Sequence, residues 1–575
     1  MSKSVNFNVQ RLSLRLLALI NLFWVSSAVY GTTYYVSNNG NDSNDGSTLT
    51  NAFSTLQHAA NQVTAGDEVL VENGTYVGFN MTTSGSANNP ILFQALGAGA
   101  VINQPNEFTN KDGINIEGGN WVIIDGFICQ NLLRAGIRVV TANNCIVRNN
   151  TCLDNGVWGI FSGFTDDLLL ENNECANAQS QHGIYVSNSS DRAIIRHNEC
   201  HGNYASGIQI NADASLGGDG ISSDAQIYNN ILYNNGVSGG AAINLDGAVD
   251  ARIFNNLLYD NHATGITLFQ IDAASPSINA KIYHNTIIQA VDGRWGVLIV
   301  NGSTGAKLFN NIVITKHPWR GTVGVDAASA SGLLSDYNIF TDRLGLDGDN
   351  SRITLAQWRA STGQDVNSQV ADPLNALFVL TNDNYRLLPE SQAVDTGTAL
   401  AYLGAYTDIL GVSRPRGAAF DVGAYEFNLS YANRLQIYDS SLSEDNGDGL
   451  PGVDSNQNGV PNLIEYALDV PSPNTMINSL LPIVSTYSDG SNLWVSFDWR
   501  ENKRAGDLYY AVEYSYDLSD PSSWNRVVVD GIDSVQSTLD EDIDGDNTAY
   551  LNRISKKVNL NNHDSCFYRL TVEVL

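Results

Sequence analysis

The chain has 575 residues, with 60 Asp or Glu against 30 Lys or Arg, which gives a formal net charge of −30. A surface of this sign repels the phosphates of nucleic acids and anionic lipid headgroups, so we expect neither as a partner. The length allows two or three domains and a sizeable core.

The N-terminus has the pattern of a secretory signal peptide. Arg11 and Arg15 precede the apolar run LLALINLFWV and the small residues SSA, an order typical of an exported precursor that is cleaved just beyond them. The apolar run is too short to span a bilayer, and no later segment approaches the length needed. We therefore expect a leader at residues 1–31 and a secreted bacterial protein that is soluble and monomeric, without membrane insertion.

A repeat organises residues 110–340. Its signature is a pair of polar residues ending in Asn, which recurs roughly every 20 to 30 residues, at Asn149-Asn150, Asn172-Asn173, His197-Asn198, Asn229-Asn230, Asn255-Asn256, His284-Asn285 and Asn310-Asn311. Each pair follows a short apolar strand such as CIVR or AIIR, and a second strand such as GIYVS or AINLD separates it from the next pair. Strands at this period, without helices, predict an all-β fold built as a parallel β-solenoid.

Stacking of turns explains which residues recur. Successive turns lie about 4.8 Å apart, so asparagine side chains can hydrogen-bond from turn to turn, and asparagine tolerates the left-handed backbone of a tight corner. Cys152, Cys175 and Cys200 occupy one predicted core column whose later members are leucine, isoleucine or valine. We expect these three cysteines to be free, buried thiols rather than disulfides or metal ligands.

This repeat resembles the right-handed parallel β-helix of secreted pectate-lyase-like proteins. The opening TYYVSNNGNDSNDGSTLTNAFSTLQHAANQVTAGDEVLVENGTY, residues 33–76, is similar to the N-terminal segment of bacterial β-helix proteins that include alginate lyases, chondroitinases and pectate lyases. In such proteins NAFSTLQHAANQV forms a helix that caps the open end of the core, where an uncovered strand would invite aggregation. NYRLLPESQAVDTG and RPRGAAFDVGAYEF resemble the closing segment of the same group. The resemblance implies a fold that lyases, hydrolases, epimerases and non-catalytic adhesins share.

Alternation along the glycine-led strands divides their side chains between core and surface. One predicted outward column reads Arg138, Phe161, Tyr185, Gln209, Asn244, Thr267 and Leu298, and the next reads Val140, Gly163, Ser187, Asn211, Asp246, Phe269 and Val300. The polar members of the middle turns therefore form one predicted patch, made of Tyr185, Gln209, Asn211, Asn244 and Asp246. The long interval beside it, NADASLGGDGISSDA, carries Asp213, Asp219 and Asp224, and insertions in a regular solenoid commonly supply function.

His182 stands just before the glycine of its strand. Strict alternation directs its ring into the core, whereas the start of a strand also permits a ring held by backbone at the surface, and both interpretations stay open. Trp158 and Trp295, with Arg294 beside the latter, are candidate sugar-stacking platforms, and core packing is the alternative for each tryptophan.

Three functions fit this pattern. A uronan lyase must neutralise a carboxylate, remove the adjacent proton and protonate the leaving oxygen, for which the candidates are Tyr185 and His182 with Gln209, Asn211 or Arg138, and Ca²⁺ in the groove is a further option. A glycoside hydrolase needs two carboxylates about 5 to 9.5 Å apart, for which Asp213 and Asp246 are the candidates. A glycan-binding or adhesion protein without catalysis is the third. We expect a polysaccharide-active enzyme and place the lyase first.

A calcium loop is predicted at DSNQNGVPNLIE, residues 454–465. Oxygen-bearing residues fall at positions 1, 3, 5, 9 and 12 of an EF-hand-type loop, with a glycine at position 6 and a backbone carbonyl at position 7; they are Asp454, Asn456, Asn458, Asn462, Glu465, Gly459 and Val460. The preceding DNGDGLPG resembles calcium-rich repeats of thrombospondin and dockerin type. We expect a structural Ca²⁺ in a linker at residues 428–480, with a plain Asn/Gly turn region as the alternative.

The last segment alternates in the manner of β-strands. LWVSFDWR, LYYAVEYSYD, NRVVVDGI and CFYRLTVEVL predict a small β-sandwich-like module at residues 481–575. This module resembles C-terminal modules of secreted proteins from polysaccharide-degrading bacteria, which implies sorting, anchoring or carbohydrate binding. The β-helix with its cap and closing segment is assigned to residues 32–427.

Overall fold

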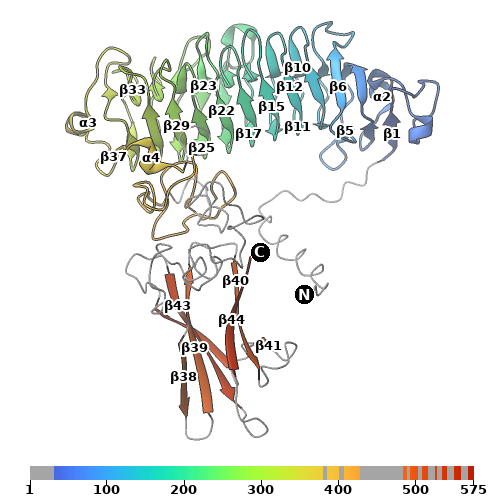
Figure 1. Cartoon of the computed structure of the whole chain (residues 1–575). Helices are drawn as coiled ribbons and strands as arrows, with labels where there is room; N and C mark the ends of the chain where they lie inside the picture. The colour runs from blue at the N-terminus through green and yellow to red at the C-terminus, as the bar shows by residue number, and fades with distance from the viewer. Residues whose placement is uncertain are drawn as a thin grey trace. The chain divides into compact units, whose positions relative to one another are not determined.

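The computed structural model describes residues 31–379, 385–400 and 407–427, together with the backbone of strands between residues 483 and 574. Its strands form a parallel β-solenoid of about 12 turns over residues 68–370, as the repeat predicts (Figure 1). Within the described residues, no helix has the length and hydropathy that a membrane span requires. The predicted leader and the predicted calcium loop, from Asp454 to Glu465, lie outside the described residues, so both stay predictions.

The chain divides into two compact units. The first runs to Ala251 and includes Asn261–Ile278 and Asn301–Ser303, and the second comprises Arg252–Asp260, Asn279–Val300 and the residues from Thr304 on. Each unit contains its own set of stacked turns.

One turn of the first unit consists of three short strands. For example, β11 (Ile146–Arg148) is followed by β12 (Thr151–Leu153) and β13 (Trp158–Gly163), and each pairs in parallel with its counterparts in the neighbouring turns. Repetition builds three parallel sheets, named here the first, second and third sheets in the order in which the chain enters them (Figure 1).

The strand order of each sheet in the first unit follows the chain. The first sheet contains β1 (Thr33–Val36), β2 (Glu68–Val71), β5 (Ile91–Ala95), β8 (Val122–Asp125), β11, β14 (Leu169–Glu171), β17 (Ile194–Arg196) and β21 (Gln226–Tyr228). The second contains β3 (Gly74–Val77), β6 (Ala100–Gln104), β9 (Ile128–Gln130), β12, β15 (Glu174–Ala176), β18 (Glu199–His201) and β22 (Ile231–Tyr233). The third contains β4 (Phe79–Met81), β7 (Ile114–Glu117), β10 (Ala135–Val140), β13, β16 (Ile184–Ser187), β19 (Ile208–Asn211), β23 (Ala241–Asp246) and β27 (Thr264–Phe269). A short pair, β20 (Ser222–Ser223) with β24 (Ala248–Val249), lies outside these sheets.

The second unit also contains three sets of parallel strands. They are β25 (Arg252–Phe254), β28 (Lys281–Tyr283), β31 (Lys307–Phe309) and β34 (Leu334–Asp336); β26 (Leu257–Tyr259), β29 (Thr286–Gln289), β32 (Ile312–Thr315), β35 (Ile339–Phe340) and β37 (Gln369–Val370); and β30 (Val297–Ile299), β33 (Val323–Val325) and β36 (Leu344–Gly345). Helices α3 (Leu355–Thr362) and α4 (Leu374–Leu377) follow β36 and β37.

The asparagine pairs form the corner between the first and second sheets. The first residue of each pair has a left-handed backbone, with φ 56 at Asn149 and 54 at Asn172, a region that asparagine enters at low cost. The second residue is buried and bonds to the next turn. Asn150 N and Nδ2 both donate to Asn173 Oδ1 at 3.1 Å, and Asn173 donates to Asn198 in the same way at 2.9 and 3.0 Å. The predicted ladder is thus present and satisfies backbone groups that the corner would otherwise leave unpaired.

The interior of the first unit contains a column of stacked cysteines. Cys152, Cys175 and Cys200 are free and fully buried, which confirms the prediction, and Cys129 extends the column by one turn. Burial raises the pKa of the Cys129 and Cys175 thiols well above their usual range. These thiols therefore stay protonated and pack as small apolar side chains.

A short helix covers the first turn. η1 (Leu49–Asn51) precedes α2 (Leu56–Gln62), which lies inside the predicted capping segment and buries Leu56, Ala59 and Ala60. Gln57 on α2 pairs with the edge strand β4, because its Nε2 donates to Asn80 O at 3.1 Å and its Oε1 accepts from Asn80 N at 2.8 Å. The helix thereby satisfies edge groups that would otherwise be open to another strand.

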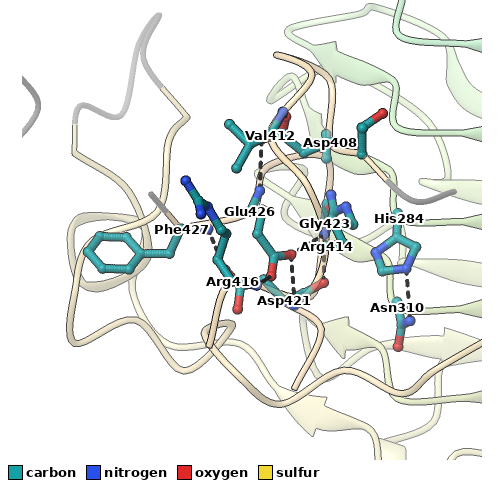
Figure 2. A network of polar contacts seen from close by, with 12 residues as sticks. His284, Asn310, Asp408, Val412, Arg414, Arg416, Asp421, Gly423, Glu426 and Phe427 are labelled. Carbon is teal, nitrogen blue, oxygen red and sulfur yellow. Dashed lines mark hydrogen bonds and ion pairs between the residues drawn. The ribbon is translucent and has the colours of Figure 1, made fainter. Parts of the chain in front are cut away.

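The closing segment, residues 407–427, is held together by a buried ionic network (Figure 2). Arg414 pairs with Glu426 at 2.9 Å, and neither side chain is exposed. Asp408 accepts from Glu426 N at 3.0 Å, and Arg414 also donates to Gly423 O at 2.8 Å. Gly423 N donates in turn to Asn310 O at 2.8 Å, which attaches the segment to the corner after β31.

The C-terminal strands form two antiparallel sheets. One has the order β38 (Ile483–Ser488), β39 (Leu493–Asn502), β43 (Ala549–Val558) and β42 (Ser534–Asp540), and the other β41 (Asn525–Arg526), β40 (Leu508–Ser515) and β44 (Phe567–Val574). Strands therefore occur within each of the four sequence segments predicted to form them.

Candidate functional site

The third sheet of the first unit presents the two predicted outward columns in register. In successive strands from β10 to β23, the first column holds Arg138, Phe161, Tyr185, Gln209 and Asn244. The second column holds, from β13 to β23, Gly163, Ser187, Asn211 and Asp246. The register derived from alternation is confirmed, because the isoleucines of the same strands are fully buried. The predicted exposure of the second column is wrong for most of its members, since Ser187 is 2% and Asp246 1% exposed.

Aromatic rings gather at the start of this face. The Trp158 ring lies 4.5 Å from the Phe161 ring and 5.8 Å from the Tyr185 ring, measured between centroids, and Phe161 meets Tyr185 edge to face at 5.4 Å. All three are partly exposed. Trp158 Nε1 donates to Gln181 Oε1 at 2.8 Å, which fixes the orientation of the indole. Partly exposed rings held in this way offer a flat surface to the apolar face of a sugar.

His182 lies next to Tyr185 and not in the core. It precedes β16, so strand alternation does not apply to it, and its partly exposed ring meets the Tyr185 ring edge to face at 5.2 Å. Its Nδ1 accepts from the backbone N–H of Ser206 at 3.0 Å. Burial lowers the pKa of His182 to about 4, so at neutral pH the ring is uncharged and carries its proton on Nε2. Of the two interpretations left open by the sequence, the structure shows the backbone-held ring.

Tyr185 is the centre of the polar part of the face. Burial raises the pKa of its phenol, and the carboxylates of Asp213 and Asp272 raise it further, while the nearby side chains of Ser187 and Asn211 lower it. Asn211 Nδ2 donates to Asp272 Oδ2 at 3.2 Å, and its buried Oδ1 has no hydrogen-bond partner within the described part of the chain. The phenol therefore stays protonated at neutral pH, beside an acceptor that is available to it.

Gln209 and Asn244 are linked to each other. Gln209 is only 5% exposed, and its Oε1 accepts from Asn244 Nδ2 at 2.8 Å and from Ser206 Oγ at 3.1 Å. The predicted substrate-binding role of Gln209 is thereby restricted, because its oxygen already has two donors. Asn244 is the more exposed of the two amides.

The two predicted carboxylates have different local roles. Asp246 is 1% exposed, and its oxygens accept from the backbone N–H groups of Ile271 at 3.0 Å and Asp272 at 2.9 Å, so it anchors the loop after β27. Asp213 accepts from Ser215 N at 2.8 Å at the start of η2 (Ala214–Leu216). Both oxygens of Asp246 are engaged by backbone, which leaves Asp213 as the more accessible member of the predicted pair.

Asp272 belongs to the site but was missed by sequence reasoning. Its backbone carbonyl accepts from Ala214 N at 3.0 Å, which places the loop after β27 against the loop that begins at Asp213. The signal in the sequence was the long segment between the strands ITLF and KIYH, which carries this aspartate. Alternation assigns side chains within strands and says nothing of contacts between two loops.

Arg138 lies two strands away from Tyr185 along the same column. It forms an ion pair with Glu117 and donates to Asn115 Oδ1 at 2.7 Å. Arg138 can bind a substrate carboxylate only through N–H groups that Glu117 and Asn115 do not use, and a guanidinium has five N–H donors in all.

Comparison with known proteins identifies the fold. Residues 34–182 match the family model described as Pel9A-like, right handed beta helix region. The fold is that of a pectate-lyase-like β-helix. The crystal structure of pectate lyase Pel9A is 18% identical, with 70% of this chain and 98% of that chain covered and a TM-score of 0.50. No curated protein matches the sequence.

Two further solved structures are similar to this pectate-lyase-like β-helix. The complex of XylC with xylose is 12% identical, with a TM-score of 0.45 over 69% of this chain and 98% of that chain. The alginate lyase from Paenibacillus sp. str. FPU-7 is 20% identical, with a TM-score of 0.34 over 47% and 94%. At such identities the likeness concerns the fold alone.

In the second unit of the pectate-lyase-like β-helix, Trp295 is not a sugar platform. Its side chain is 0% exposed, and Nε1 donates to Asp349 Oδ1 at 2.6 Å. The stacking interpretation is therefore wrong and the alternative of core packing holds, because the ring is enclosed, with the guanidinium carbon of Arg352 4.5 Å from its centre. Arg294 beside it is exposed.

Calcium in the groove stays a prediction. Within the described residues, no three His, Cys, Asp or Glu side chains lie close enough to hold one metal ion, whereas protein calcium sites use six to eight oxygen ligands, several of them carboxylates. The surface around Trp158, Tyr185 and Asn211 on the third sheet is called the third-sheet face below, and no reaction step on it is assigned to a metal ion.

Proposed function

We propose that this protein is a lyase that cleaves a uronate-containing polysaccharide by β-elimination on the third-sheet face of the first unit. The observation that carries the proposal is the cluster of the Trp158, Phe161 and Tyr185 rings, in which Tyr185 also meets the His182 ring and lies beside the Asn211 amide. Binding sites for sugars need flat apolar surface next to a few oriented hydrogen-bonding groups. A pectate lyase among the structures of like fold supports an acidic polysaccharide as the substrate class.

Tyr185 is the proposed proton-transfer residue. As the phenolate it takes the proton from the carbon that bears the uronate carboxylate, and the electrons of that C–H bond form a carbon–carbon double bond. The bond from the neighbouring carbon to the glycosidic oxygen then breaks, and the new phenol O–H returns its proton to that oxygen. The phenolate is regenerated, so one residue serves as base and then as acid.

His182 is a hydrogen-bond donor in this scheme rather than the base. Its Nδ1 is occupied by Ser206 N–H, so the proton resides on Nε2, which is free to donate to the substrate carboxylate. Withdrawing charge from that carboxylate makes the adjacent C–H more acidic. Arg138, two strand spacings or about 10 Å from Tyr185, would bind a uronate of a neighbouring residue of the polymer.

A glycoside hydrolase is the second candidate. The specific observation in its favour is that the loops of Asp213 and Asp272 are in contact, through Ala214 N and Asp272 O at 3.0 Å, and that both carboxylates raise the pKa of Tyr185. Two carboxylates on either side of a glycosidic bond are the machinery of hydrolysis. Asp272 takes the place of Asp246 in the candidate pair of carboxylates, because both oxygens of Asp246 accept hydrogen bonds from backbone N–H groups.

Two assays on one panel of polymers separate these functions. The protein is incubated with pectate, alginate and glucuronan, and both the ultraviolet absorbance of unsaturated uronates and the number of reducing ends are followed. A lyase increases both signals together. Reducing ends without absorbance would establish hydrolysis, and neither signal on any acidic polymer, despite binding, would establish a glycan-binding protein.

A further inference from the structure

An exposed tryptophan is stacked on an arginine in the second unit, next to the buried Trp295. Trp319 follows β32 and is 47% exposed. The guanidinium carbon of Arg352 lies 3.4 Å from the centre of the Trp319 ring and 4.5 Å from the centre of the buried Trp295 ring. Arg352 is thus enclosed between two indoles, and it supports one face of Trp319.

The loop that carries Trp319 is held by its own hydrogen bonds. His317 Nδ1 accepts from Trp319 N at 3.0 Å and from Arg320 N at 2.9 Å. Arg343 donates to the carbonyls of Pro318 at 2.5 Å and His317 at 2.6 Å. Arg352 Nε donates to Trp319 O at 2.8 Å. Consecutive carbonyls therefore each have an arginine donor, and a ligand meets a surface that is ordered before it binds.

Arginine charge is concentrated around this loop, although the chain as a whole is acidic. Asp349 pairs with Arg320 at 2.7 Å and with Arg352 at 3.4 Å. The charge of Asp292 acts to raise the pKa of His317, and the charge of Asp347 acts to raise that of Arg352. Arg343 has no carboxylate partner among the described residues, and its Nε is buried without an acceptor.

Arg320 is the arginine best placed to reach a ligand. Its side chain is 26% exposed, and its guanidinium carbon lies 5.8 Å from the Trp319 ring. One of its donors is used by Asp349, and guanidinium has five in all. A half-exposed indole with a guanidinium 5.8 Å from its ring centre matches a sugar ring that carries a carboxylate, because the sugar ring stacks and the carboxylate accepts from the guanidinium.

We propose that Trp319 and Arg320 form a second saccharide-binding site, selective for anionic sugars, which binds without cleaving. Uronate oligosaccharides are the ligand class, in preference to acidic peptides, because a flat ring face is needed to use the exposed indole. This proposal does not depend on catalysis at the third-sheet face, because the two sites share no residue.

Titration of the full-length protein with hexamers of galacturonate and of mannuronate tests this site. Binding is followed by calorimetry and by tryptophan fluorescence, in a Trp158→Ala, Tyr185→Phe background that limits both consumption of the ligand and its binding to the third sheet of the first unit. We expect Trp319→Ala to weaken this binding at least about tenfold, which corresponds to about 1.4 kcal/mol, and Trp319→Phe to retain most of it. Arg320→Gln should weaken binding of the acidic hexamer and leave that of its neutral methyl ester unchanged.

Matched controls keep the result interpretable. Arg192, which is exposed and paired with Asp166 and Asp167, is the control arginine, and Phe108, which is 62% exposed, is the control aromatic residue. Neither Arg192→Gln nor Phe108→Ala should change the affinity. The proposal is overturned if Trp319→Ala binds like its parent, if that parent background binds neither hexamer, or if a hexaglutamate peptide binds as tightly as the uronates. Cleavage of polymer is measured separately in the Tyr185-containing protein, so either proposal can fail alone.

Discussion

At the scale of single residues, short contacts determine which chemistry each side chain can perform. His182 has the residue type of a base, but one backbone N–H on Nδ1 and a pKa of about 4 make it a neutral donor. Tyr185 has the residue type of a weak acid, and burial raises its pKa further. The proposed mechanism therefore gives the proton transfer to Tyr185 and a hydrogen-bond donor's role to His182.

The pH dependence of turnover follows from these two groups. Because the pKa of Tyr185 is raised above 10, the phenolate fraction, and with it kcat/KM, should increase about tenfold per pH unit through the neutral range. His182 is already neutral above about pH 4, so no inflection is expected between pH 6 and 7. Initial rates from pH 5.5 to 9.5 measure this profile. An inflection near pH 6.5 that disappears in His182→Asn would assign the base to His182 instead.

Trp158 is expected to act on binding and not on the proton transfer. Its ring is next to Phe161 and Tyr185, and stacking on a sugar is equally strong before and during the reaction. Trp158→Ala should raise KM about tenfold and change kcat by less than about twofold, with Trp158→Phe in between. Steady-state kinetics on the cleaved polymer measure both constants. A large fall in kcat with an unchanged KM would contradict the platform role.

At the scale of elements, the two asparagines of each corner have different roles. Asn172 supplies a left-handed backbone and is exposed, whereas Asn173 is buried and bonded to the turns on both sides. Asn173→Ala should therefore lower the free energy of unfolding by about 2 kcal/mol, because Asn150 N–H and its amide lose their acceptor. Asn172→Gly is the matched control and should cost a few tenths of a kcal/mol at most. Urea unfolding measures both, and equal losses would show that the ladder contributes nothing beyond the turn.

The closing segment offers a second stability prediction. Arg414 and Glu426 are paired and fully buried (Figure 2), and removing one member leaves the other charge without compensation. Glu426→Gln should destabilise the protein by about 3–5 kcal/mol. Arg192→Gln, which breaks exposed pairs with Asp166 and Asp167, should cost less than about 1 kcal/mol. Thermal unfolding of the two variants makes the comparison, and a Glu426→Gln protein as stable as Arg192→Gln would contradict the buried pair as a clamp.

The elements that the sequence predicted well are those in which periodicity determines position. The alternation of the strands gave the column from Arg138 to Asn244, and the recurring pairs gave the corners. Contacts that depend on loops were not accessible to the same reasoning. Asp272 contacts Asn211 from the loop after β27, and Trp295 is enclosed by Asp349 and Arg352. Neither contact follows from the spacing of the repeat.

At the scale of the whole molecule, the β-helix fold and the net charge of −30 are compatible with many functions. The side chains on the third-sheet face narrow the choice further. An acidic protein that acts on an acidic polymer must concentrate donors where the polymer binds, because the remaining surface repels it. In the two proposals above, His182 and Arg138 supply such donors on one unit and Arg320 supplies them on the other. Binding of polyuronates is accordingly expected to depend on ionic strength.

Calcium is proposed as a stabilising ion of the segment at residues 454–465. Its pattern from Asp454 to Glu465 supplies hard oxygen ligands at alternate positions. Saturating Ca²⁺ at about 100 times its Kd should stabilise the protein by about 2.7 kcal/mol, and Glu465→Gln should reduce this gain while Glu390→Gln leaves it intact. Thermal unfolding with Ca²⁺ and with a chelator measures the difference. A transition that calcium leaves unmoved would remove this proposal.

The most direct test of the account is the formation of unsaturated uronates by the wild type and by Tyr185→Phe on the same acidic polymer. The wild type should produce ultraviolet absorbance in step with new reducing ends, and Tyr185→Phe should lose at least about a thousandfold of that rate, since acid–base transfer contributes of this order, while it still binds the polymer. Absorbance formed by Tyr185→Phe at the wild-type rate would contradict the assignment of the proton transfer to Tyr185.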